Sequence, residues 1–178
     1  MSNVLIGIIG VILFIGLALA GALFLGPRFQ QATTNSKAAK IVSDMQQISA
    51  AINMARVQDG TSMQATNYTT NVSTLVPNYL KSEPTVPTSG QKYEAIDQDG
   101  GNRAMPVHHL QAIVGADTDP VAQAVCRTIV VNAGYQDPDA AMSPVFDGAG
   151  WGVKVRGGKG FGCFLFGPAK TYYAYMVL

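Results

Sequence analysis

One apolar run near the start constrains the fold of this chain more than any other feature. Residues 4–25 read VLIGIIGVILFIGLALAGALFL and include no charged side chain. A helix of about 22 residues is about 33 Å long, which is enough to cross the hydrocarbon layer of a bilayer. We therefore predict an apolar membrane-spanning segment over residues 1–27, and we expect the rest of the chain to be tethered by it.

The flanks of this run differ from those of an ordinary signal peptide. Such a peptide has basic residues before a short apolar region, whereas only the uncharged residues 1–3 precede the run here. Arg28, Lys37 and Lys40 follow it, and by the positive-inside rule they would place the domain in the cytoplasm. The conflict between these cations and an extracytoplasmic domain disappears if Met1 is the first residue left after a basic leader is removed. We take that processing as a hypothesis.

Small residues recur in the run at four-residue spacing, for example Gly16 with Ala20 and Ala18 with Ala22. In lipid, such pairs allow helices to approach closely. We therefore predict that this helix packs against other helices in an assembly, through Leu5, Gly7, Gly10, Gly16, Ala20, Gly21 and Ala22.

Gly26 and Pro27 end the apolar run. Glycine lowers helix stability and proline removes a backbone donor, so we predict a kink or unwinding at these two residues when their surroundings change. The alternative remains that glycine and proline are simply common in membrane helices.

Residues 28–59 have the pattern of an amphipathic helix. Ile41, Met45, Ile48, Ile52 and Ala55 are spaced 4, 3, 4 and 3 apart and therefore share one face. We predict one long helix from residue 2 to residue 57, with residues 33–36 as the place where it would break if it were two helices.

Residues 60–178 are predicted to form one globular head. Residues 61–74 are polar and are expected to be a loop, and residues 75–80 a short helical or turn segment. Strands are expected at 92–96, 107–114, 151–155, 162–166 and 171–177, with a turn at 97–102. The fold class is therefore α+β: a long N-terminal helix, apolar and then amphipathic, packed under a C-terminal antiparallel sheet.

Asp119 and Pro120 mark the start of a helix in the head, with Asp119 as its N-cap and Gly134 just past its end. Cys126 falls on this helix and Cys163 on a predicted strand. The two cysteines can form a disulfide if the head is outside the cytoplasm. The alternative is a pair of buried free thiols.

The sequence contains no motif that indicates catalysis. Nucleotide, hydrolase and zinc-peptidase patterns are missing, and most aspartates flank glycine or proline as turn residues do. His108 and His109 are adjacent and point in different directions, so they are not expected to share a metal. The net charge of +1 and the charged fraction of 13% do not suggest nucleic-acid binding. We expect no enzyme activity and no cofactor. Asn67 and Asn71 begin glycosylation sequons, which short polar loops also produce by chance.

The order of these features resembles the type IV pilins: an apolar helix continuing into an amphipathic one, the segment LVPNYL at 75–80, and a C-terminal cysteine pair. The segment QAVCRTI at 123–129, after the apolar residues 110–114, resembles the corresponding helix of type IVb pilins of the toxin-coregulated kind. The resemblance implies a homopolymer, a helical surface filament whose core is made of the apolar helices. It also implies a prepilin peptidase that exposes Met1, often N-methylation of Met1, an inner-membrane pool of subunits, and an ATPase-driven assembly machinery.

Leu5 departs from that family pattern, because pilins usually carry a glutamate at this mature position. In that family pattern, the glutamate is implied to be the counter-charge for the terminal amine of a neighbouring subunit. Its absence is also typical of some minor subunits. We expect the major subunit of a type IVb-like pilus. The second hypothesis is a minor pilin or secretion-system pseudopilin that primes or caps a filament. The third hypothesis is a single-span envelope protein with an extracytoplasmic binding domain.

Overall fold

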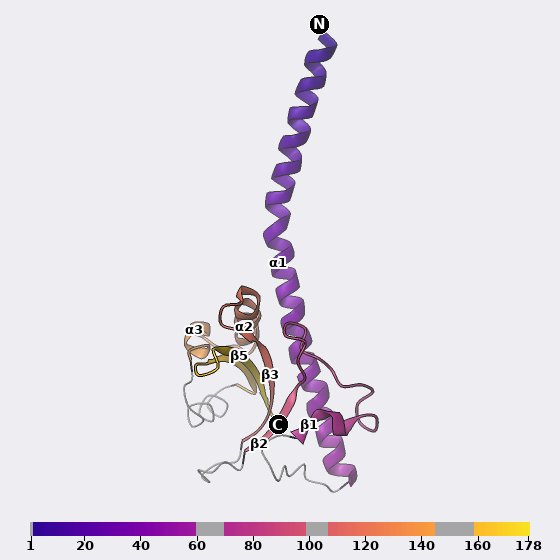
Figure 1. Cartoon of the computed structure of the whole chain (residues 1–178), viewed down its shortest axis with the longest axis vertical. Coiled ribbons are helices and arrows are strands. Elements are labelled where there is room, and N and C mark those ends of the chain that lie inside the picture. Colours follow the sequence, from indigo (N-terminus) through magenta and orange to yellow (C-terminus); the bar gives the residue numbers. More distant parts are fainter. Residues whose placement is uncertain (1, 60–69, 99–106, 145–158) are drawn as a thin grey trace.

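The computed structural model describes residues 2–59, 70–98, 107–144 and 159–178. Helix α1, Ser2–Asp59, extends through 58 residues without interruption. Its N-terminal half projects away from the rest of the molecule, and the head gathers around its C-terminal half (Figure 1). The predicted single long helix is confirmed.

The helix continues through the two places where the sequence suggested a weakness. Gly26, Pro27 and residues 33–36 are all helical. The hydroxyl of Thr33 donates to the carbonyl oxygen of Phe29 at 2.8 Å, one turn earlier. The suggested break at 33–36 is therefore wrong for the isolated subunit. Unwinding at Gly26 and Pro27 in changed surroundings remains a prediction.

The head contains a fully antiparallel sheet in the order β1-β2-β3-β5-β4. Its strands are β1 (Thr70–Asn71), β2 (Glu94–Gln98), β3 (Val107–Ala116), β4 (Phe161–Phe166) and β5 (Thr171–Val177). The α+β class and four of the predicted strands are confirmed. The fifth predicted strand, at 151–155, lies outside the described residues, as do residues 99–102 of the predicted turn.

Three short elements differ from the predicted loops. Strand β1 and most of the 3-10 helix η1 (Val72–Leu75) lie in the stretch expected to be a loop. Strand β1 forms because Thr70 and Asn71 pair with β2. Helix α3 (Pro138–Ala141) was not predicted. Its cap is local, since the carboxylate of Asp137 accepts hydrogen bonds from the backbone N–H groups of Asp139 and Ala140.

Helix α2, Pro120–Asn132, begins and ends as predicted. The Oδ1 atom of Asp119 accepts a hydrogen bond from the backbone N–H of Val121 at 2.8 Å, and Pro120 occupies the first turn. Gly134 has a φ of +79°, a conformation that glycine adopts without strain. This helix lies beside the C-terminal half of α1 and against the sheet (Figure 1).

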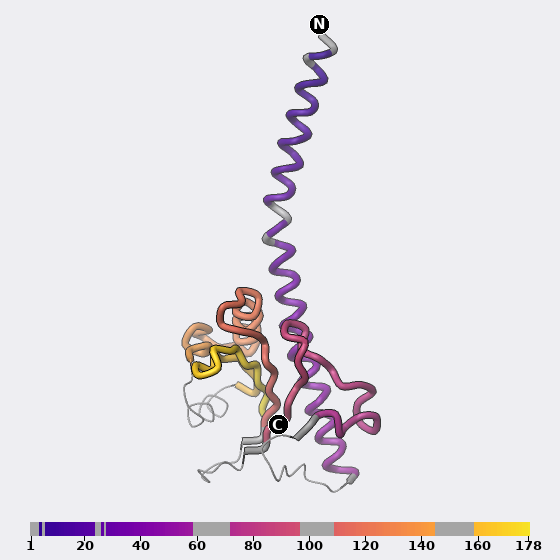
Figure 2. The backbone as a smooth tube through the Cα atoms, in the orientation of Figure 1, coloured from indigo at the N-terminus to yellow at the C-terminus, as the bar shows by residue number. Residues whose placement is uncertain are grey.

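The main core lies between α1, α2 and one face of the sheet. The predicted stripe of α1 is buried in it, with Ile41 and Ile48 fully inaccessible to solvent. The apolar side chains of α2 and the inward-facing residues of β3 and β5 complete the core, including Val125, Ile129, Leu110 and Ala174. Tracing the backbone shows that the N-terminus lies at the far tip of α1, whereas the C-terminus lies within the head (Figure 2). The head therefore has its own core and leaves half of α1 uncovered.

The opposite face of the sheet carries a smaller aromatic cluster. Phe164 and Tyr175 are buried there, and Phe166 and Tyr173 pack beside them. The ring of Tyr175 lies across Gly162, because a Cβ at that glycine would come within 2.7 Å of the Tyr175 hydroxyl. That hydroxyl is 2.7 Å from the hydroxyl of Tyr135, in the segment after α2. Gly162 thus lets the tyrosine pair join the sheet to this segment.

Candidate functional site: the exposed half of α1

The N-terminal half of α1 is apolar and exposed on all sides. Its large apolar side chains from Val4 to Leu23, where described, are 50–78% exposed. In the described part of the chain, α1 is the one helix that is long and apolar enough to cross a membrane, and its most apolar stretch has no buried residue. Exposing so large an apolar surface to water is energetically unfavourable, so lipid or other protein must cover it.

The predicted packing residues all lie on this half of the helix. A Cβ added at Gly7, Gly10, Gly16 or Gly21 would meet no other atom within 4 Å, so the fold of the subunit itself does not require these glycines. Ala20 and Ala22 are part of the same surface, and Ala22 is exposed. Their role in packing against other copies stays a prediction. Met1 and the side chains of Leu5 and Pro27 lie outside the description.

The exposed half connects to the head through a polar neck, residues 28–37. Arg28, Phe29 and most of the neighbouring side chains are exposed, and Ala38 is the first buried residue of α1. Going from the N-terminus, Asp44 is the first acidic residue of the chain. The uncovered part of α1 therefore carries cations but no carboxylate.

Asp44 and Tyr93 connect the helix to the head through a buried polar contact. The Asp44 carboxylate accepts hydrogen bonds from the Lys40 ammonium at 2.8 and 2.9 Å and from the Tyr93 hydroxyl at 3.1 Å. Asp44 is 5% exposed and Tyr93 is 1% exposed. This contact was not predicted from the sequence. The available signal was an acidic residue three and four positions from Ile41 and Ile48 on the buried stripe, with Lys40 one turn before it.

Burial and the nearby Asp44 carboxylate raise the pKa of Tyr93 well above its usual value of 10. Burial and the hydrogen bond to Tyr135 raise the pKa of Tyr175 in the same way. Both hydroxyls therefore stay protonated in the folded head at a pH where an unfolded chain would ionise them.

We expect the head to lose stability as the pH rises above about 10, because the unfolded state then releases protons that the folded state retains. Each tyrosine contributes at most about 1.4 kcal/mol per pH unit above that point. Thermal unfolding of the full chain in detergent between pH 8 and 11 measures the loss. Tyr93→Phe should flatten the alkaline slope, whereas an equal slope in this variant would contradict the assignment.

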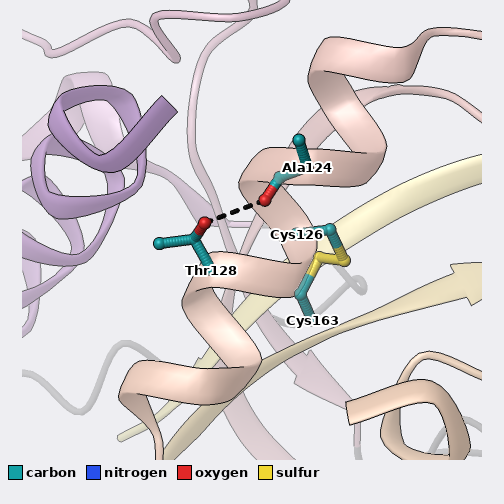
Figure 3. The surroundings of a disulfide bond; sticks show 4 residues. All are labelled: Ala124, Cys126, Thr128 and Cys163. Carbon is teal, nitrogen blue, oxygen red and sulfur yellow. Dashed lines mark hydrogen bonds between the residues drawn. A yellow bond between two sulfur atoms is a disulfide. The ribbon is translucent and has the colours of Figure 1, made fainter. Parts of the chain in front are cut away.

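The disulfide predicted between Cys126 and Cys163 is present. It joins the middle of α2 to β4, and both residues are buried (Figure 3). On the same helix, the Thr128 hydroxyl donates to the carbonyl oxygen of Ala124 at 2.9 Å. The alternative of two free thiols is wrong. Since such bonds persist in oxidising compartments, the disulfide indicates an extracytoplasmic head.

The described residues contain no group of three histidine, cysteine, aspartate or glutamate side chains that could hold a metal ion. His109 is buried in the sheet at 2% exposure, on β3. His108 precedes it on the same strand, and the side chain of His108 lies outside the description.

Comparisons with protein-family models, with curated proteins and with solved structures found no match to this chain. A long apolar N-terminal helix packs its second half against a C-terminal antiparallel sheet, and a disulfide closes the head. This arrangement is pilin-like.

Proposed function

We propose that this chain is the structural subunit, the major pilin, of a type IVb-like pilus. It polymerises through the apolar half of α1 into a helical surface filament. The observation that carries the proposal is the contrast between the two halves of α1: the first half is apolar and exposed on all sides, while the second half buries its apolar stripe in the core of the head. Such a subunit can exchange a lipid environment for an environment of neighbouring helices.

Before assembly, the apolar half would sit in the inner membrane with the head on the extracytoplasmic side. The disulfide supports this side for the head. The cations Arg28 and Lys37 next to the span oppose it under the positive-inside rule, unless a basic leader precedes Met1. The proposal therefore includes a prepilin peptidase that exposes Met1, and an assembly machinery that extracts the subunit. Catalysis, cofactors and nucleic acid have no part in it.

A minor pilin or pseudopilin is the second candidate, and Leu5 favours it. Without a glutamate at this position, a terminal ammonium buried among apolar helices has no side-chain counter-charge nearby in sequence. A major subunit would then need Ser2, Asn3 or opened backbone carbonyls to solvate the amine.

The decisive experiment is to shear filaments from producing cells and measure this chain in the fibre fraction by mass spectrometry. The major-pilin proposal expects it to be the dominant protein. Trace amounts would favour the minor subunit. A chain that stays in the membrane under assembly-competent conditions, with no fibres, would contradict both and favour a single-span envelope protein.

Ala20→Leu is expected to abolish or strongly reduce fibres while the protein still inserts in the membrane. Ala20 lies in the small-residue pattern with Gly16, where a larger side chain prevents close helix approach. Fibre yield and the amount in the membrane fraction are measured together. The matched control is Leu19→Ile, which keeps the volume at the neighbouring position. Normal fibres from Ala20→Leu would count against assembly through this face.

A further inference from the structure

The polar neck, residues 28–37, joins the projecting half of α1 to the head (Figure 1). We propose that its two cations, Arg28 and Lys37, bind the headgroups of anionic phospholipids while the apolar half lies in the membrane. The inference rests on the membrane state in the proposed function, and it adds the class of lipid that the subunit selects. It applies equally to a major subunit, a minor subunit and a single-span protein, because all three share that state.

The two cations of the neck have no counter-charge within the described part of the chain. The ion pairs of the described residues join other cations to the carboxylates of Asp44, Glu83 and Asp139. Asp44, the first carboxylate in the sequence, is 5% exposed and already accepts hydrogen bonds from a lysine and a tyrosine. Arg28 and Lys37 are therefore available to an anion from outside the subunit.

Arg28 lies at the level of the lipid headgroups when residues 4–25 cross the bilayer. It follows Leu25 by three residues, a rise of about 4.5 Å along the helix axis. The hydrocarbon core is about 30 Å thick and the whole bilayer about 40–45 Å, so each headgroup layer is about 5–8 Å thick. Arg28 is exposed and Phe29 beside it is 75% exposed, so the head does not shield this level of the helix. The guanidinium can therefore pair directly with a lipid phosphate.

Lys37 places a second cation on the opposite side of the helix. It follows Arg28 by nine residues, which is about two and a half turns and about 13.5 Å along the axis. Side chains on a helix lean towards its N-terminus, which is the membrane side of the neck, so the ammonium lies nearer the lipid than the Cα atom does. Lys37 is half-buried, and a long lysine stem can pack while its charge stays in polar surroundings. The two cations therefore meet different lipid molecules around the helix.

The neck between the two cations is uncharged, so only their positive charges discriminate between lipids. Residues 30–36 read QQATTNS and include no carboxylate that would repel a phosphate. Phosphatidylcholine has no net charge, whereas phosphatidylglycerol has a negative one. A lysine or arginine near an anionic bilayer surface favours binding by about fivefold. The neck should therefore gather the anionic lipid.

The test measures which lipid gathers around the neck of the full chain in phosphatidylcholine vesicles. Ala32→Cys, at an exposed position of the neck, carries a donor fluorophore, since the native cysteines are paired and buried. The vesicles contain a trace of phosphatidylglycerol or of phosphatidylcholine with an acceptor on its acyl chain. We expect energy transfer to show at least about a fivefold preference for phosphatidylglycerol. The preference should disappear in 1 M salt, where the screening length is about 3 Å.

Charge variants connect the preference to the neck. Arg28→Gln together with Lys37→Gln should abolish it, whereas Arg28→Lys together with Lys37→Arg keeps both charges and should retain it. The matched control, Lys81→Gln together with Lys159→Gln, removes two exposed lysines of the head and should also retain it. Equal transfer to the two lipids in the wild type, or an unchanged preference without Arg28 and Lys37, would overturn the proposal. A wild type that inserts in neither kind of vesicle would refute the membrane state of the proposed function, and this inference with it.

Discussion

Replacing both Cys126 and Cys163 by alanine is expected to lower the free energy of unfolding of the head by about 4 kcal/mol. The bond closes a loop with a sequence separation of 37 residues, so its loss gives the unfolded chain much more freedom. Thermal unfolding of the full chain in detergent, followed by near-ultraviolet circular dichroism, measures the effect. A loss of this size should lower the Tm by about 12–20 °C for a head of this length.

Reduction of the wild-type protein is the matched comparison for this prediction. Dithiothreitol should lower the wild-type Tm by a similar amount and leave the double variant unchanged. Because both cysteines are buried, reduction requires partial unfolding and should be slow at low temperature. Equal Tm values for the wild type and the double variant without reductant would show that α2 and β4 are held together by packing alone.

Ile48→Ala is expected to destabilise the attachment of the head to α1 by about 2–5 kcal/mol. Ile48 is fully buried in the stripe that faces the core, so its truncation leaves a cavity between the helix and the head. We expect a lower Tm and faster cleavage of the head by a protease added to the full chain in detergent.

Met54→Ala is the control on the same helix. Met54 is 52% exposed on the other side of α1, and truncating an exposed side chain usually changes stability by less than about 0.5 kcal/mol. Equal losses for Ile48→Ala and Met54→Ala would mean that the buried stripe does not hold the head on the helix.

The parts of this fold that depend on local chemistry were predictable from the sequence. The unbroken apolar run and the 4, 3, 4 and 3 spacing of Ile41, Met45, Ile48, Ile52 and Ala55 predict the long helix and its buried face. Asp119, Pro120 and Gly134 define α2 because caps act within one helical turn. Strand β5 has the predicted bounds, since turn residues flank it.

The parts that depend on contacts between distant residues required the tertiary structure. The pairing of β3 with β5, the contact of Asp44 with Tyr93 and the hydrogen bond between the hydroxyls of Tyr135 and Tyr175 each join segments far apart in the chain. The sequence predicted the Cys126–Cys163 disulfide only if the head is outside the cytoplasm, whereas the approach of α2 to β4 brings the two cysteines within bonding distance.

The candidate site, the exposed half of α1, also has features that depend on local sequence and features that depend on tertiary contacts. Composition alone determined that residues 4–25 form an apolar helix, because local apolar content decides what lipid or protein can cover it. The spacing of Ile41, Met45, Ile48, Ile52 and Ala55 also predicted which side of the second half of α1 is buried, but not which segments cover it. That covering comes mainly from α2, with Tyr93, 49 positions after Asp44, adding a polar contact, and only the tertiary structure brings segments so distant in the chain together.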